Sequence, residues 1–245
     1  MMKPEIKIFP SVEKLADYFI TRISDELRSK KTGQYFTIAL SGGSTPKAIF
    51  KIIAEQYNNK IDWSKVLIFW SDERCVPPSD KESNYGMTLE NLFKNLYLPE
   101  LNFCRIKGES DPVEEAARYS GVVDKMLRHE HHVPQFDLIL LGLGDDGHTA
   151  SIFPSNIHLF DSDRLFDVSE HPVTKQIRIT ATGKLINNAV NVFFIVTGSG
   201  KAEKVAQILN REEGWKELPA SQVNPAHGEL VWLLDEAAGK DVVME

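Results

Sequence analysis

Short runs of apolar residues recur along the chain and predict buried β-strands. A strand that is covered on both faces has about four to eight consecutive apolar residues in its sequence, whereas a half-exposed strand alternates apolar and polar positions. Runs of the first kind occur at Tyr35–Leu40, Val66–Trp70, Phe136–Leu141, Val192–Thr197 and Leu230–Leu234.

Between these runs the apolar spacing becomes helical. Ser11–Arg28 and Ala202–Leu209 carry apolar residues three and four positions apart, which places them on one stripe of a helix. Strands that alternate with helices predict an α/β fold with a mostly parallel open sheet and helices on both faces. Ligands of such sheets bind beyond the carboxyl ends of the strands, so we expect the chemistry in the loops that follow the strands.

One segment, Asn156–Thr174, interrupts the alternation because it is polar, has Pro154 before it and has Pro172 near its end. We expect either an insertion or a flap over the active site. The chain shows no internal repeat, low-complexity tract or linker rich in Gly and Ser. This predicts a single α/β domain over residues 1–245.

The charge of the chain narrows the choice of partners. With 28 Lys and Arg against 35 Asp and Glu, the net charge is -7 at pH 7. Such a charge repels nucleic acid and anionic membranes, so neither is expected as a partner, and an anionic ligand needs a local cluster of donors. No secretory signal and no apolar run of about 18 residues is visible, which predicts a cytoplasmic protein.

Neither the cysteines nor the clustered histidines suggest a metal site. Cys75 and Cys104 are too few for a disulfide scaffold or a cysteine-based zinc site, and we expect buried thiols. We expect His129, His131 and His132 to end a helix, where the dipole favours solvated cations. No metal and no cofactor is therefore predicted, and the sequence leaves the oligomeric state open.

The loop after the first predicted strand is a candidate phosphate site. It reads Ser41, Gly42, Gly43, Ser44, Thr45 and Pro46. The glycines let the backbone approach a ligand, Ser44 or Thr45 can cap the next helix, and Pro46 suits its first turn. The amides and the helix dipole would then converge on a phosphate or an oxyanion, and an ordinary strand–helix turn is the alternative.

The loop Gly142–Pro154 follows another predicted strand and carries a candidate base. Three of its glycines match the spacing of a dinucleotide-binding motif, but two aspartates among them would face a pyrophosphate and a proline ends the helix early. We interpret the glycines as letting Asp146 and His148 project into a cleft. A histidine oriented by a carboxylate, here Asp146 or Asp72, is a general base near neutral pH, and a structural histidine is the alternative.

Further charged and polar candidates follow other strands. Asp72 and Arg74 come directly after a buried run, and Asn84 lies a short loop later. Arg178 interrupts a strand-like alternation, and Lys201 opens a helix after a glycine-rich turn. The three cations together could hold one dianionic phosphate, whereas each alone reads as an ordinary surface charge.

With these residues in view, the chain resembles the 6-phosphogluconolactonase family, within the group that includes glucosamine-6-phosphate deaminases. The resemblance extends from about Ile8 to Leu234 and rests on Leu40–Pro46, Ser71–Arg74, Ser83–Gly86, Gly142–Pro154, Arg178–Thr180 and Asn187–Ala189. It implies a Rossmann-like fold and metal-independent hydrolysis of 6-phosphogluconolactone in the oxidative pentose phosphate pathway. It also implies a base at His148 and a phosphate pocket at the first loop with Arg74, Arg178 and Lys201.

Two alternative functions, a deaminase and a non-catalytic sensor, are less well supported by the sequence. The deaminase branch has an Asn-Glu-Pro sequence where this chain has Ile152, Phe153 and Pro154, and Phe153 cannot move protons as that Glu does. A non-catalytic sugar-phosphate sensor would carry a DNA-binding segment, but the region before the first loop is too short for a helix-turn-helix unit. The retained Asp146 and His148 also favour an enzyme.

Overall fold

The computed structural model describes residues 3–57, 59–94 and 102–244 of the chain. Its main sheet has six parallel strands in the order β1-β11-β10-β7-β2-β3. These strands are β1 (Glu5–Phe9), β2 (Phe36–Leu40), β3 (Val66–Trp70), β7 (Leu138–Leu141), β10 (Asn191–Val196) and β11 (Glu229–Asp235). The predicted α/β fold with a parallel sheet is confirmed. Only β1 of this sheet was not predicted, because an edge strand of mixed polarity lacks the continuous apolar run.

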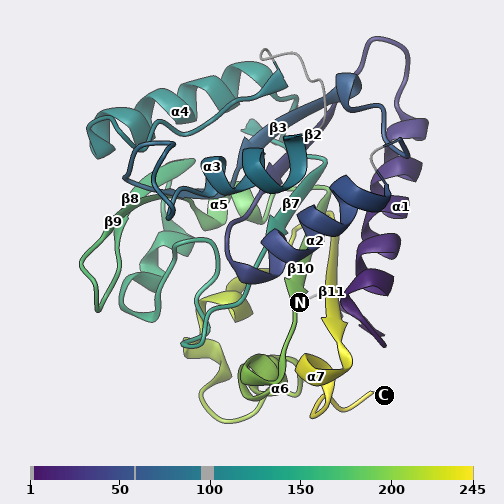
Figure 1. Cartoon of the computed structure of the whole chain (residues 1–245). Helices are drawn as coiled ribbons and strands as arrows, with labels where there is room; N and C mark the ends of the chain where they lie inside the picture. The colour runs from purple at the N-terminus through teal and green to yellow at the C-terminus, as the bar shows by residue number, and fades with distance from the viewer. Residues whose placement is uncertain (1–2, 58, 95–101, 245) are drawn as a thin grey trace.

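Helices cover both faces of the sheet, as predicted. Figure 1 shows α1 (Val12–Ser29) and α2 (Ser44–Gln56) on one side and α4 (Pro112–Met126) on the other. Helix α1 begins where the Ser11 side chain accepts a hydrogen bond from the Lys14 amide at 3.3 Å, a cap worth about 1 kcal/mol. The shorter helices are α3 (Asn84–Thr88), α5 (Gly183–Ile186), α6 (Ala202–Leu209) and α7 (Glu236–Gly239).

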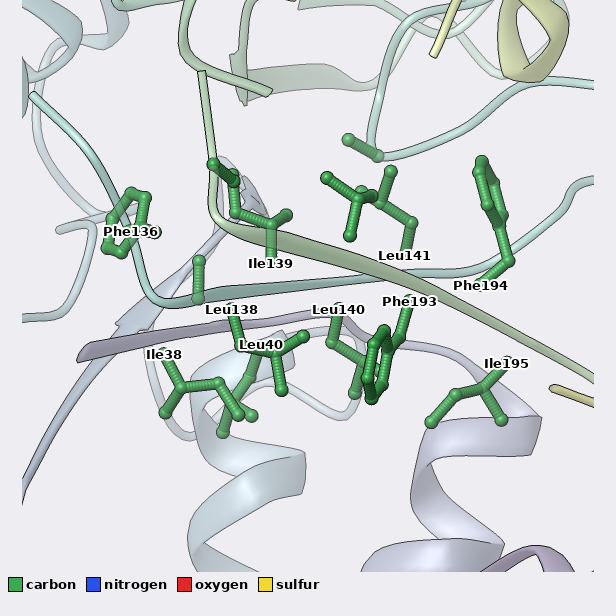
Figure 2. Packing of buried hydrophobic residues seen from close by; sticks show 14 of the residues in the cluster. Ile38, Leu40, Phe136, Leu138, Ile139, Leu140, Leu141, Phe193, Phe194 and Ile195 are labelled. Atoms are coloured by element: carbon green, nitrogen blue, oxygen red, sulfur yellow. The ribbon is translucent and has the colours of Figure 1, made fainter. Parts of the chain in front are cut away.

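The core forms on both faces of the central strands. Alternate residues of a strand point to opposite faces, and in Figure 2 Leu140 and Phe193 extend to one side of β7 and β10 while Leu141 and Phe194 extend to the other. Phe19 of α1 meets Phe193 edge to face at 6.5 Å, which fixes this helix on one face. Both strands are buried along their whole length, which explains their uninterrupted apolar runs.

A second sheet packs beside the first and carries part of the site. It is antiparallel, with β4 (Asp72–Arg74), β9 (Ile177–Ala181) and β8 (Phe166–Glu170) in that order. The segment Asn156–Thr174, for which we expect an insertion or a flap, provides most of a 3₁₀-helix (Pro154–Asp161) and the whole of β8. The segment is therefore part of the framework that holds β9.

The histidine cluster and the cysteines differ in detail from expectation. The three histidines are exposed but do not end a helix, because α4 stops at Met126 and an extended residue follows it. They lie in a hairpin formed by β5 (His129–Glu130) and β6 (Val133–Pro134), whose turn has positive φ at both intervening histidines. Cys75 and Cys104 are half-buried, and burial raises the pKa of each thiol to about 11. No helix in the described ranges is long and apolar enough to cross a membrane.

Candidate active site

A pocket opens where the chain leaves neighbouring strands in opposite directions. From β2 the chain continues to β3 on one side, and from β7 it leads to β10 on the other side. The loops diverge at such a point and leave a crevice at the carboxyl ends of the strands. The pocket has a volume of about 220 Å³, and every predicted site residue except Asp146 lines it: Ser41, Gly42, Gly43, Ser44, Thr45, Asp72, Arg74, Asn84, His148, Arg178 and Lys201.

The first loop presents backbone rather than side-chain caps to the pocket. Helix α2 begins at Ser44 with Gly43 as its N-cap residue and no side-chain cap, so the prediction that Ser44 or Thr45 caps this helix is wrong. Thr45 instead shares a hydrogen bond of 2.8 Å between its hydroxyl and that of Thr197, at the end of β10. Amides at the start of α2 thus lack a side-chain acceptor, which suits an anion.

The buried carboxylate of Glu73 organises the second loop. It accepts hydrogen bonds of 2.7–3.0 Å from the amides of Arg74, Asn84 and Tyr85 and from the Ser83 hydroxyl. Burial raises the pKa of this carboxyl, against the effect of the three amides. Glu73 thereby joins the two motifs that the sequence shows as separate segments.

Asn84 lies directly against the first loop. Its side-chain amide donates to the Asp72 carbonyl at 3.0 Å, and a Cβ at Gly42 would come within 1.7 Å of its Oδ1. Only glycine allows this contact. The first and second loops therefore contact each other at the pocket through Gly42 and Asn84.

His148 enters the pocket with Asp146 behind it. The Nδ1 atom of His148 lies 2.6 Å from Asp146 Oδ1, and the His148 amide donates to the same oxygen at 3.1 Å. A Cβ at Gly144 would lie 2.0 Å from this Nδ1, so glycine makes room for the ring. Burial opposes ionisation of Asp146, but the hydrogen bond and charge of His148 outweigh it and lower the pKa of the carboxyl to about 2. Asp72 makes no hydrogen bond to the ring.

Two guanidinium groups meet in the pocket wall. Arg74 and Arg178 are directly opposite each other on β4 and β9, where like charges repel. Burial, reinforced by the Arg74 charge, lowers the pKa of Arg178. Arg74 donates to the Glu82 carbonyl at 2.6 Å, but the Nε atoms of both arginines are buried without a hydrogen-bond partner among the described residues. Buried cationic donors without acceptors indicate a site for an anion.

The third predicted cation, Lys201, is paired with Asp145. The Asp145 side chain is 88% exposed, so this ion pair lies at the mouth of the pocket and contributes little to stability. From the sequence, Asp145 was interpreted only as an obstacle to a pyrophosphate. In the structure Asp145 is the ion-pair partner of Lys201, and both residues line the pocket.

His171 lies close to the site and was not predicted from the sequence. The Phe153 ring is 4.7 Å from the ring of His148 and 4.9 Å from that of His171, and Arg178 lies over the same ring at 5.6 Å. Burial lowers the pKa of His171, and the charges of Arg178 and His148 add to the shift. No local signal identifies His171, because it stands in a polar segment without periodicity. Among the described residues no three His, Cys, Asp or Glu side chains gather closely enough to hold a metal ion.

Comparisons with known proteins identify relatives over nearly the whole chain. Residues 10–232 match the model of the family described as glucosamine-6-phosphate isomerases/6-phosphogluconolactonase. The chain is 41% identical over 203 residues to a 6-phosphogluconolactonase of Treponema pallidum, covering 83% of each chain. It is 40% identical over 202 residues to one of Haemophilus influenzae, covering 82% of this chain and 85% of the other. A solved 6-phosphogluconolactonase from Trypanosoma cruzi matches with a TM-score of 0.86 and 27% identity, over 99% of this chain and 98% of that one.

Proposed function

Because this chain belongs to the glucosamine-6-phosphate isomerase/6-phosphogluconolactonase family, we propose that it hydrolyses 6-phospho-D-glucono-1,5-lactone to 6-phospho-D-gluconate. One observation carries the proposal: a single pocket combines a histidine held by a carboxylate with two arginines whose Nε atoms are buried without a hydrogen-bond partner among the described residues. The histidine suits proton transfer during hydrolysis, and the guanidiniums suit a phosphate dianion.

His148 is the general base in this mechanism. Its Nε2 takes a proton from a water molecule that attacks C1 of the lactone, while Asp146 holds Nδ1–H and stabilises the imidazolium. Donors of the pocket stabilise the tetrahedral oxyanion. The C1–ring oxygen bond then breaks, and the ring oxygen receives the proton from His148. No covalent intermediate and no cofactor is needed, because positioning and a base suffice for a reactive lactone.

The phosphate is bound by Arg74, Arg178 and Lys201. Each lines the pocket, and the two arginines offer Nε donors that have no other partner in the described part of the chain. The uncapped start of α2 adds backbone amides and the positive end of the helix dipole. This local cluster gives a protein of net charge -7 a site for a dianion.

Phe153 opposes the deaminase alternative. The side chain is fully buried and lies 4.7 Å from the His148 ring, where it can neither donate nor accept a proton. A carboxylate at this position would be buried beside the imidazole and could relay protons. The apolar ring instead leaves His148 as the base beside the pocket, which suits one proton transfer in a hydrolysis.

The test is hydrolysis of freshly prepared 6-phosphogluconolactone, measured above its spontaneous rate by coupled oxidation of the product, with glucosamine 6-phosphate as the control substrate. His148→Ala should lower kcat by roughly 10²–10⁴-fold with a smaller change in KM, because a positioned base is lost. Near-wild-type turnover by a folded His148→Ala protein would contradict the mechanism.

The same assay tests the proposal that no metal takes part. We expect full activity after exhaustive chelation, because the carboxylate beside His148 acts on an organic base in this mechanism. Loss of activity on chelation, restored by one particular divalent ion, would require a different mechanism.

A further inference from the structure

Ser151 joins two pocket residues, Asp72 and Arg178, that lie far apart in the sequence. Its side chain is fully inaccessible to solvent, and its hydroxyl donates to Asp72 Oδ2 at 2.6 Å. Nη1 of Arg178 approaches the same hydroxyl at 3.4 Å. A serine oxygen can donate one hydrogen bond and accept another, so the three side chains form a chain from carboxylate through hydroxyl to guanidinium.

The hydroxyl keeps the two charges apart. Asp72 and Arg178 form no ion pair, although the Asp72 charge favours the charged form of the guanidinium and so opposes the lowering of the Arg178 pKa. A direct pair would neutralise the guanidinium and occupy its donors. With Ser151 between them, Arg178 keeps a buried Nε without a partner in the described residues.

Ser151 is itself held rigidly by the second sheet. Its amide donates to the Thr180 hydroxyl of β9 at 3.1 Å, and its carbonyl accepts the Ser169 hydroxyl of β8 at 2.5 Å. These contacts fix the hydroxyl in the wall of the pocket. They also supply a matched control, because Ser169 is a buried serine that lies opposite Arg178 in the β8–β9 pairing. Its hydroxyl bonds the Asn156 side chain and the Ser151 carbonyl and, within the described residues, not the Arg178 guanidinium.

We propose that Ser151 is a positioning residue for phosphate recognition, which with Asp72 holds the Arg178 guanidinium toward the pocket. The proposal rests on the proposed function for the identity of the anion as the substrate's phosphate. Asp72 then acts on Arg178 through Ser151 and does not orient His148. Its burial and its hydrogen bond to Ser151 fit this role.

The experiment compares Ser151→Ala with Ser169→Ala. Isothermal titration with inorganic phosphate measures anion binding without turnover, and steady-state kinetics separate KM from kcat. Ser151→Ala should weaken phosphate binding and raise KM for the phosphorylated lactone by about 3–10-fold, the value of one ordinary hydrogen bond, because the Arg178 contact is long, with a smaller effect on kcat. Ser169→Ala should stay within about twofold of the unmodified protein. Unchanged phosphate binding by Ser151→Ala, or an equal loss in Ser169→Ala, would overturn the proposal.

Asp72→Asn is a second test variant, because asparagine keeps the shape of the aspartate side chain but removes its charge. It should weaken phosphate binding in the same direction, and the double variant should be no worse than the more affected single one, because both changes break one chain of contacts. The fall of kcat/KM at acid pH, which is the acid limb of the pH–rate profile, should keep its midpoint. A limb that moves in Asp72→Asn would assign Asp72 to the histidine and refute its role in holding Arg178. If the unmodified protein binds phosphate but does not hydrolyse the lactone, only the proposed function fails, since the titration needs no turnover.

Discussion

At the scale of single residues, the orientation of the His148 imidazole depends on which carboxylate contacts it. Asp146 stands two residues before His148 and accepts hydrogen bonds from both its ring and its amide. The lowered pKa of about 2 keeps Asp146 ionised throughout the neutral range. A fixed negative charge beside the ring orients the imidazole with Nδ1 as the donor to Asp146.

Asp146→Asn removes that charge while keeping an acceptor oxygen. We expect the acid limb of kcat/KM to move to lower pH, because the imidazolium loses its stabilising partner. We also expect kcat to fall by less than the roughly 10²–10⁴-fold of losing the base itself. The measurement is a pH–rate profile with unphosphorylated gluconolactone, which has no phosphate to titrate.

Asp145→Asn is the matched control for this prediction. It removes the adjacent carboxylate, which is exposed and pairs with Lys201 instead of the ring. Its acid limb should lie much closer to that of the unmodified protein. An equal displacement in both variants would mean that the limb responds to the general charge of the loop and not to the Asp146 contact.

At the scale of elements, the short strand β4 and the helix α3 behave as one unit through Glu73. The four groups that hydrogen-bond to its carboxylate within the described residues are all donors, and the residue is 2% exposed. Glu73→Gln would place an amide NH₂ against donors. We expect it to lower the free energy of unfolding by about 1–3 kcal/mol and to raise KM through displacement of Asn84. Urea unfolding and steady-state kinetics measure the two effects.

Glu82→Gln serves as its control, because Glu82 is an exposed carboxylate in the same loop. Its carboxylate accepts a hydrogen bond from the Gln176 side-chain amide at the surface. The free energy of unfolding should change by no more than about 0.5 kcal/mol. Similar losses in the two variants would show that the loop responds to charge and not to the buried network.

At the scale of the whole molecule, the two sheets share one hydrophobic core. The buried cluster contains Ile139 of the main sheet together with Phe166 and Ile179 of the second sheet. We therefore expect the single predicted domain to unfold in one cooperative step, with coincident urea transitions by tryptophan fluorescence and far-UV circular dichroism. Trp70 and Trp232 report from separate strands of the main sheet. Two separated transitions would show that the sheets unfold independently.

Local patterns in the amino-acid sequence predict much of this architecture. The five predicted strands of the main sheet and helices α1 and α6 follow from hydrophobic periodicity, which depends only on neighbours in sequence. The prediction that chemistry lies after the strands depends on a general property of parallel sheets. Strand β4 was not predicted, because three consecutive polar residues show no hydrophobic periodicity and because its pairing with β9 is not local.

The amino-acid sequence by itself determined the α/β class, the strand positions and the residue types that surround the pocket, because these follow from local spacing and chemistry. The tertiary structure decided how these residues pair. It placed Arg74 opposite Arg178, paired the His148 ring with the Asp146 carboxylate, and joined Asp72 to Ser151 across 79 positions of the chain. The first and third of these contacts join residues far apart in the chain, so they depend on how distant segments pack against each other, which no periodic pattern in the sequence encodes. The contact of His148 with Asp146 is local, and the sequence left it open only against Asp72.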